Sequence, residues 1–388
     1  KVYKVMKILI VSDNYPSERF PSMGVFVYNL IQQFAKIGHE VTVISPQSQK
    51  RRFSKPKGEY GLELAKVYRP FFFSASDKDF LIFNTNSIGE KFQAIAITKV
   101  VKKYNIQFDV VYAHFLSNAF VAVRALRSYG KPIFAAIGEY DNLKVRKEYY
   151  SKATYLKYLN QINGFIAVSP QIKMRLIEYG AIDERIIVKP NAVDFSLFHK
   201  RDKLLMRKKY GFSATDKLII FVGRFLHNKG PIRVIEATDR LENLGLIMVG
   251  DGPQEIVGEN VIFKGKVNFS QVPELLSAAD LFVLPTLHEG SCNAIVEAMA
   301  CGLPIVSSDI PEIKVQCSPS FSRLVNPLSV RQIEKAISEI IKDDKLLLGM
   351  SNYALEASKD FDIVERAQSI LSFIGKELIQ KNNPLDGN

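Results

Sequence analysis

Short apolar segments alternate with amphipathic segments along most of the chain. The first unit reads "KILIVSD", then "GVFVYNLIQQFAKIGHE", then "VTVISP", and this periodicity predicts a strand, a helix and a strand. A second series follows later, with "LIIFVGR", "LGLIMVGDG", "LFVLPT" and "PIVSSD" separated by helical segments. Strands that are joined by helices pair in parallel. The pattern therefore predicts an α/β protein with two doubly wound, Rossmann-like domains.

The two series meet near residues 194–205, where a charged stretch follows the last strand of the first series. A chain of 388 residues is also too long for one ordinary core. We predict an N-terminal domain over residues 1–195 and a C-terminal domain over residues 196–361. Ligands of such open sheets bind at the carboxyl ends of the strands, so two such domains would hold a ligand in the cleft between them.

The composition excludes several classes of protein. A hydrophobic content of 47% with 24% charged residues is typical of a folded soluble chain. No apolar run approaches the ~18 residues of a membrane-spanning helix, and the N-terminal "ILIV" is too short for a signal peptide. The cysteines Cys292, Cys301 and Cys317 are odd in number and lack CxxC spacing. They predict reduced, buried thiols in a cytoplasmic protein, with neither a disulfide nor a metal site.

Positive charge is concentrated in the first half of the chain. Residues 1–200 contain 30 Lys and Arg against 16 Asp and Glu, whereas residues 201–388 contain 22 against 24. The segment "QKRRFSKPKG" collects basic residues near Phe53, and "KFQAIAITKVVKKY" combines apolar and basic residues at helical spacing. Such runs are usually solvated. Several of them on one domain nevertheless indicate an anionic partner, either a membrane surface or nucleic acid.

Two cations follow the first strand of the second series, in "VGRFLHNKG". Arg224 stands beside Gly223 at the strand end, and Lys229 precedes Gly230, which permits a tight turn into a helix. If the two cations converge, their guanidinium and ammonium groups would suit a diphosphate. A pair of surface cations is the alternative. The Gly-rich ends "MVGDGPQ" and "FKGKV" would add bare backbone for a nucleotide, although the first lacks the GxGxxG dinucleotide pattern.

The segment "HEGSCNAIVEAMACGLPIV" contains Glu289 and Glu297, on either side of a predicted helix start. The backbone N–H groups at that start would form a phosphate site. Because a carboxylate accepts hydrogen bonds, each Glu would bind hydroxyl groups beside the phosphates. Spacing alone favours a plainer interpretation, with one loop carboxylate and one first-turn carboxylate that interacts with the helix dipole.

Two residues of the first domain lie where a ligand could approach. Gly24, in "PSMGVFVYN", stands at the start of the first helix, and simple helix entry is its alternative role. His114, in "VVYAHFLSN", lies at the carboxyl end of a predicted strand. A single histidine is often structural, but this position also fits binding or acid–base chemistry.

Together these segments resemble the retaining nucleotide-sugar glycosyltransferases of family 4, which have the GT-B architecture of two Rossmann-like domains facing a central cleft. The resemblance rests on E-x7-E with "EAMACGLP", on "FVGRFLHNKG", "VGDGP" and "PNAVDFSLF", and on "GVFVYNLIQQFAKIGHEVTVIS". It covers nearly the whole chain. It also implies that a C-terminal helix at about residues 362–388 crosses back onto the first domain.

The resemblance implies a role for each candidate residue of the donor site. Arg224 and Lys229 would neutralise the donor diphosphate and stabilise the leaving nucleotide. Glu289 would contact the hydroxyls of the donor sugar, and Glu297 would bind the ribose. The remaining donor-binding residues would be Gly24, Gly223, Ser291, Cys292, Asn293, Ala294 and Ile295.

The chain departs from the family pattern in its first domain and in the turn after it. Family members often have a His-Gly pair where this chain has Ile137 and Gly138. His114, on the acceptor side of the cleft, or Glu139 would then take part of the missing histidine's role. Ala192 replaces a usual glycine in "PNAVD". The resemblance implies a metal-independent enzyme without a cofactor, in which cations and a helix N-terminus stabilise the diphosphate, and we see no plausible DxD metal site.

We therefore expect a retaining hexosyltransferase that uses a nucleoside diphosphate sugar and a saccharide or lipid-linked saccharide acceptor, in cell-envelope polysaccharide or glycoconjugate synthesis. The enzyme would be cytoplasmic, and its basic domain would allow a peripheral position on the inner face of the membrane. An epimerase or hydrolase of the same fold is one alternative. A basic nucleic-acid-binding protein is another, but the chain has no RNP-type motif.

Overall fold

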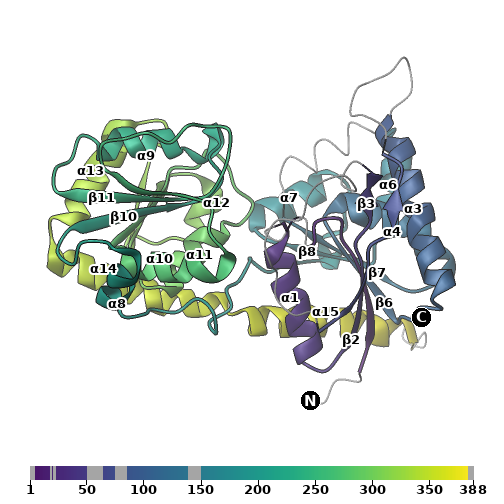
Figure 1. Cartoon of the computed structure of the whole chain (residues 1–388). Coiled ribbons are helices and arrows are strands. Elements are labelled where there is room, and N and C mark those ends of the chain that lie inside the picture. The colour runs from purple at the N-terminus through teal and green to yellow at the C-terminus, as the bar shows by residue number, and fades with distance from the viewer. Residues whose placement is uncertain are drawn as a thin grey trace. The chain divides into compact units, whose positions relative to one another are not determined.

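The computed structural model describes residues 5–17, 20, 23–49, 64–74, 85–138 and 150–382. The chain forms two compact units, Lys1–Pro190 with Val364–Asn388, and Asn191–Ile363. The sequence placed the corresponding junctions near residues 195 and 361. Each unit contains a parallel sheet with helices on both faces (Figure 1), so the predicted α/β architecture of two Rossmann-like halves is confirmed.

In the N-terminal unit the described main sheet has the strand order β4-β2-β1-β6-β7-β8-β9, with every pair parallel. A short separate ladder joins β3 (Gln47–Ser48) to β5 (Phe71–Phe72). Since β1 pairs with β2 and β6, the loops after these strands open at one edge of the sheet. The strands are β1 (Lys7–Val11), β2 (Glu40–Ile44), β4 (Lys66–Tyr68), β6 (Val110–His114), β7 (Ile133–Ile137), β8 (Gly164–Ala167) and β9 (Ile186–Val188).

Successive strand residues point to opposite faces of the sheet. Helices cover both faces, so the side chains on each face are buried. Leu9 and Val111 pack with α3 and α4, whereas Ile8 and Tyr112 pack with α1 and α15. The described helices of the unit are α1 (Val25–Lys36), α3 (Thr85–Lys103), α4 (Leu116–Leu126), α6 (Lys152–Leu159), α7 (Pro170–Glu178) and α15 (Ile363–Asn382).

The C-terminal helix α15 belongs to the N-terminal core. It places an apolar stripe with helical spacing against the sheet, formed by Ala367, Ile370, Leu371 and Ile374. The chain therefore returns to its first unit after completing the second. Among the helices in the described ranges, none is both long enough and apolar enough to span a membrane.

In the C-terminal unit the sheet has the order β12-β11-β10-β13-β14-β15, again with parallel pairs. Its strands are β10 (Lys217–Val222), β11 (Leu244–Val249), β12 (Val261–Gly265), β13 (Leu281–Leu284), β14 (Ile305–Ser308) and β15 (Ser322–Val325). Helices α9 and α13 lie on one side of it, and α10 and α11 lie on the other (Figure 1). The helices are α8 (Lys203–Tyr210), α9 (Pro231–Thr238), α10 (Val272–Ala278), α11 (Asn293–Ala300), α12 (Pro311–Lys314), α13 (Val330–Ile341) and α14 (Asp344–Ser358).

A buried ion pair fixes α8 to the start of this sheet. Arg207 Nη2 lies 2.6 Å from Asp280 Oδ2, and Lys203 Nζ lies 2.5 Å from Asp280 Oδ1. The same carboxylate accepts the Leu218 N–H at 2.8 Å, and Arg207 Nε donates to Ala278 O at 3.0 Å. Because these polar groups satisfy one another, the loss of one leaves a buried charge uncompensated.

Replacing Asp280 with alanine should destabilise the C-terminal unit by about 3–5 kcal/mol, because the Arg207 guanidinium would stay buried without its counter-ion. Urea unfolding followed by far-UV circular dichroism measures the loss. Lys359→Ala is the matched control, because it breaks only the exposed pair with Glu356 and should change stability by less than about 1 kcal/mol. Equal effects of the two substitutions would contradict this account.

Candidate functional site

The loops that follow the neighbouring strands β10 and β11 pack backbone against backbone. The Gly223 N–H donates to Val249 O at 3.0 Å. A Cβ atom at Gly250 would lie only 1.8 Å from Gly223 O, so no side chain fits at Gly250. The glycines at these two strand ends therefore serve a close approach between loops, and they leave bare backbone at the carboxyl edge of the sheet.

Lys229 and Glu289 meet at this edge, although they are 60 residues apart in the chain. Lys229 ends a short 3-10 turn, His227–Lys229, after β10, and Glu289 lies in the loop after the neighbouring strand β13. The Lys229 ammonium donates a hydrogen bond to Glu289 Oε1 and forms an ion pair with it. Since an ammonium group has three N–H donors, this bond leaves two for an anionic ligand.

Arg233, on α9, ties the same two loops together. Its Nη1 donates to His227 O at 3.0 Å, and its Nη2 donates to Pro285 O at 2.8 Å. The Leu287 N–H also donates to Asn228 O at 2.7 Å. Burial lowers the pKa of the Arg233 guanidinium. The sequence gave no signal for this role of Arg233, because it depends on contacts between loops that chain spacing does not show.

Arg224 follows β10 after one residue, Gly223, and is exposed. Within the described ranges its side chain makes no ion pair, so the structure does not join it to Lys229 and Glu289. The guanidinium is therefore available to an anionic group at the same edge of the sheet.

The helix α11 begins just after the Glu289 loop. Its N-cap residue, Cys292, makes no side-chain cap hydrogen bond. The first N–H groups of a helix carry partial positive charge, so this start favours an anion. Among the predicted loop residues, Cys292 and Ile295 bury their side chains in the core and Ala294 packs partly against it, which leaves mainly their backbone to contact a ligand. In the described part of the chain, Oδ1 of Asn293 is buried without a hydrogen-bond partner.

Two buried amides hold this loop in place. The Asn191 N–H donates to Ser291 Oγ at 3.1 Å, and Asn191 Nδ2 donates to Ser291 O at 3.3 Å. From the other side, Gln316 Oε1 accepts the Cys292 N–H at 2.8 Å, and Gln316 Nε2 donates to Cys292 O at 3.2 Å. Asn191 belongs to the "PNAVD" segment that the sequence singled out, but no motif pointed to Gln316. Both residues position the start of α11.

Glu297 lies one turn inside α11 and is half-buried. Burial raises the pKa of its carboxyl group to about 7. Over the described ranges the side chain forms neither a hydrogen bond nor an ion pair. A carboxyl group that titrates near neutral pH can accept or donate a hydrogen bond, which suits a ligand with hydroxyl groups.

The cysteines are free thiols. Burial raises the pKa of Cys292, and it raises those of Cys301 and Cys317 to about 12. Cys292 and Cys301 are buried as predicted, whereas Cys317, which follows the short helix α12, is only partly buried. The residues that the structure describes contain no group of three or more His, Cys, Asp or Glu side chains that could hold a metal ion.

Gly24 begins α1 with a left-handed backbone, at φ 68°. A Cβ atom there would lie 2.2 Å from Asn14 O, in the loop after β1. The glycine is therefore required by the close packing of the helix start on that loop. Its predicted position near a bound phosphate stays a prediction.

His114 ends β6 and is buried against the rings of Phe26 and Phe115, with centroid distances of 5.4 and 4.6 Å. Burial, with a smaller effect from Arg366, lowers its pKa to about 3, so the imidazole is neutral at pH 7. A neutral imidazole can take part in hydrogen bonding but cannot act as a cationic acid. The catalytic role of His114 stays a prediction, and Glu139 lies outside the described residues.

Two family models match consecutive parts of this sequence. The model for "Glycosyltransferase Family 4" matches residues 23–197, and the model for "Glycosyl transferases group 1" matches residues 202–357. The chain belongs to glycosyltransferase family 4. TuaC of Bacillus subtilis, named as a teichuronic acid biosynthesis glycosyltransferase, is 26% identical to this family 4 enzyme over 352 residues, which is 86% of this chain and 88% of TuaC.

Solved structures show the fold of this family 4 glycosyltransferase. Sucrose-phosphate synthase from Thermosynechococcus elongatus superposes with a TM-score of 0.79 at 16% identity, over 97% of this chain and 100% of the other. HepE of Anabaena, in complex with UDP and glucose, superposes with a TM-score of 0.71 at 19% identity, over 96% of this chain and 100% of HepE. The enzyme therefore has the predicted GT-B fold.

The raised pKa of Glu297 predicts a pH dependence of stability. Its ordinary value is 4.5 and its value in the folded enzyme is about 7, so the native state binds more protons than the unfolded state between those values. Stability should therefore fall as pH rises through this window. A Glu297→Gln variant cannot titrate at this position. The free energy of unfolding of the parent enzyme minus that of this variant should therefore be lower at pH 8 than at pH 5.

Urea unfolding of both proteins at the two pH values measures this difference. Glu356→Gln, at an exposed carboxylate, is the matched control. The difference in stability between the parent enzyme and this variant should change little between the two pH values. A constant stability difference between the parent and the Glu297→Gln variant would contradict the burial of the carboxyl group.

Proposed function

We propose that this enzyme transfers a hexosyl group from a nucleoside diphosphate sugar to a saccharide or lipid-linked saccharide acceptor, with retention of configuration at the anomeric carbon. The observation that carries the proposal is the meeting of Lys229 and Glu289 beside the uncapped start of α11, at the edge where Arg224 is exposed. The UDP in the complex of its structural relative HepE supports a nucleoside diphosphate donor.

Each group at this edge suits one part of such a donor. The first N–H groups of α11 would bind phosphate oxygens, together with the two remaining donors of Lys229. The carboxylate of Glu289, held by Lys229, would accept hydrogen bonds from sugar hydroxyls. Glu297 would bind the hydroxyls of the ribose. The fixed amides of Asn191 and Gln316 would keep this arrangement rigid before the donor binds.

In the proposed reaction the bond between the anomeric carbon and the diphosphate oxygen breaks, and its electron pair goes to the leaving diphosphate. The acceptor oxygen attacks the same face of the sugar and forms the new glycosidic bond. Its proton passes to an oxygen of the leaving phosphate. Negative charge therefore grows on the diphosphate, where Arg224 and Lys229 would stabilise it. In this proposal the positive charge comes from the chain itself, without a metal ion or a cofactor.

The acceptor proposal draws on two observations. TuaC is named for teichuronic acid biosynthesis, which supports a saccharide of the cell envelope as acceptor. The excess of Lys and Arg in residues 1–200 fits a cytoplasmic enzyme that works at an anionic membrane face. A lipid-linked saccharide would present its sugar to the enzyme at such a face.

Replacing Arg224 with alanine should lower kcat about 10²- to 10³-fold, because a preorganised positive group would be lost from the transition state. The assay follows sugar transfer from a panel of UDP-, GDP- and ADP-sugars, with and without EDTA. Arg240→Ala, which removes an exposed guanidinium paired with Glu334, is the matched control and should keep the parent rate. Parent-level transfer by the Arg224→Ala variant from every accepted donor would contradict the proposal, and loss of parent activity in EDTA would contradict its metal-free form.

Omission of the acceptor separates transfer from the chemistry of an epimerase or hydrolase. A transferase should consume donor mainly when the acceptor is present, and NMR of the product should show the donor's anomeric configuration. Rapid donor conversion without any acceptor would contradict a transferase.

A further inference from the structure

The helix α3 of the N-terminal unit exposes three large apolar side chains on one side. Ile88, Phe92 and Ile95 are 36%, 42% and 48% exposed. They are four and three positions apart, so they lie on one face of the helix. The opposite face is already buried, with Ala94, Ile97 and Val101 in the core of the unit. The exposed stripe is thus a second apolar face, which the described fold leaves in solvent.

The apolar surface extends beyond the helix. Phe71, in β5, and Phe73, just after it, are both exposed. The rings of Phe73 and Phe92 meet edge to face, with a centroid distance of 5.8 Å. Isolated apolar residues on a surface need no explanation, but a contiguous group of this kind marks an interaction site.

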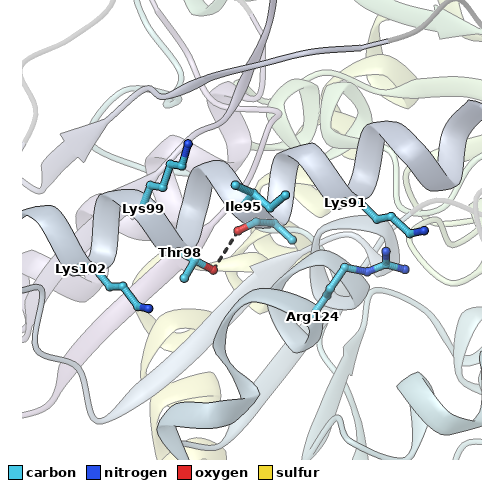
Figure 2. A pocket seen from close by; sticks show the side chains of 7 residues that line it. Lys91, Ile95, Thr98, Lys99, Lys102 and Arg124 are labelled. Carbon is cyan, nitrogen blue, oxygen red and sulfur yellow. Dashed lines mark hydrogen bonds between the residues drawn. The ribbon is translucent and has the colours of Figure 1, made fainter.

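Basic side chains border this apolar surface. Lys91, Lys99 and Lys102 of α3 and Arg124 of α4 line a shallow groove of about 390 Å³ that also includes Ile95 (Figure 2). Figure 2 shows Lys91 and Arg124 extending to the same side at one end of the groove, and Lys102 at the other end. For the three lysines no ion pair is found with any residue in the described ranges.

Negative charge is absent from the exposed face of α3. The only acidic residue in the helix is Glu90, which is buried and accepts a hydrogen bond from the Tyr150 hydroxyl. Among the described residues of α3 the lysines have no exposed carboxylate between them, so they repel one another, and an anionic partner would remove that repulsion. The partner must therefore offer both negative charge and a medium for apolar side chains.

We propose that the exposed face of α3, together with Phe71, Phe73 and Arg124, docks on a bilayer of anionic phospholipids. The apolar side chains would enter the boundary between headgroups and acyl chains, while the lysines and Arg124 stay at the level of the phosphates. Nucleic acid fits less well, because its phosphate backbone would leave Ile88 and Ile95 in water. The inference deepens the proposed function, since a docked enzyme would meet a lipid-linked acceptor at the membrane surface.

The other basic segment of the N-terminal unit, "QKRRFSKPKG", is not part of the proposed docking surface. The cationic residues of "QKRRFSKPKG" lie outside the described residues, so the proposed surface does not include them. Binding of the enzyme to vesicles can be measured in the absence of the sugar donor and of the acceptor. Failure of docking and failure of the transferase proposal are therefore distinguishable.

A single introduced tryptophan reports insertion, because the chain contains no Trp. In a Phe92→Trp variant the fluorescence should shift to shorter wavelength with vesicles of phosphatidylcholine and phosphatidylglycerol, and brominated acyl chains should quench it. Phosphatidylcholine alone should produce a much smaller shift. Tyr353→Trp, at an exposed position of α14 in the other unit, is the matched control and should show neither effect. An unshifted, unquenched emission from the Phe92→Trp variant would overturn the proposal.

Charge removal tests the same surface independently. The triple variant Lys91→Gln, Lys99→Gln and Lys102→Gln should lower the vesicle partition coefficient at least about tenfold, since each lysine near an anionic bilayer contributes severalfold. The control triple Lys335→Gln, Lys342→Gln and Lys345→Gln removes the same charge from exposed positions on α13, α14 and the turn between them. Equal losses in both triples would overturn the proposal. The proposal would also be overturned if vesicles failed to bind the parent enzyme while RNA bound it tightly and in a salt-sensitive way, and if the first triple variant abolished that RNA binding.

Discussion

Parallel pairing in each sheet is the constraint on which the rest of the structure depends. When neighbouring strands run in the same direction, the loops after them collect at one edge. In the C-terminal unit, β10 lies between β11 and β13. The loops after these three strands therefore bring together Gly223 and Gly250, and they bring Lys229 to Glu289 across 60 residues of chain. The anion-favouring start of α11 follows the last of these loops.

The sequence was sufficient to predict the strands with continuous apolar runs and the placement of the candidate residues at strand ends, but not the short strands β4 and β15. Apolar runs such as "KILIV" and "LIIFV" form β1 and β10 because both faces of a parallel sheet are buried. The sequence could not show which side chains touch. The Lys229–Glu289 pair, the clamp by Arg233 and the support from Gln316 all join segments whose distance in the chain carries no signal.

Burial decided what the sequence left open in the N-terminal unit. The helical spacing of "KFQAIAITKVVKKY" predicted a helix with one apolar and one basic face. The segment is the helix α3, but the two faces do not separate in this way. Its apolar residues are distributed over two faces, so only the fold shows that Ile97 is in the core while Ile95 is exposed. His114 is similar, because its strand-end position suggested chemistry, whereas its burial keeps the imidazole neutral.

The central claim is that the carboxyl edge of the C-terminal sheet binds the diphosphate of a nucleotide sugar. Isothermal titration of the enzyme with UDP, GDP and ADP, each compared with its nucleoside, tests this claim most directly. The account predicts that at least one diphosphate binds far more tightly than its nucleoside, and that a Lys229→Ala substitution removes most of the difference. If no nucleoside diphosphate binds, or if nucleoside and diphosphate bind equally, the account is contradicted.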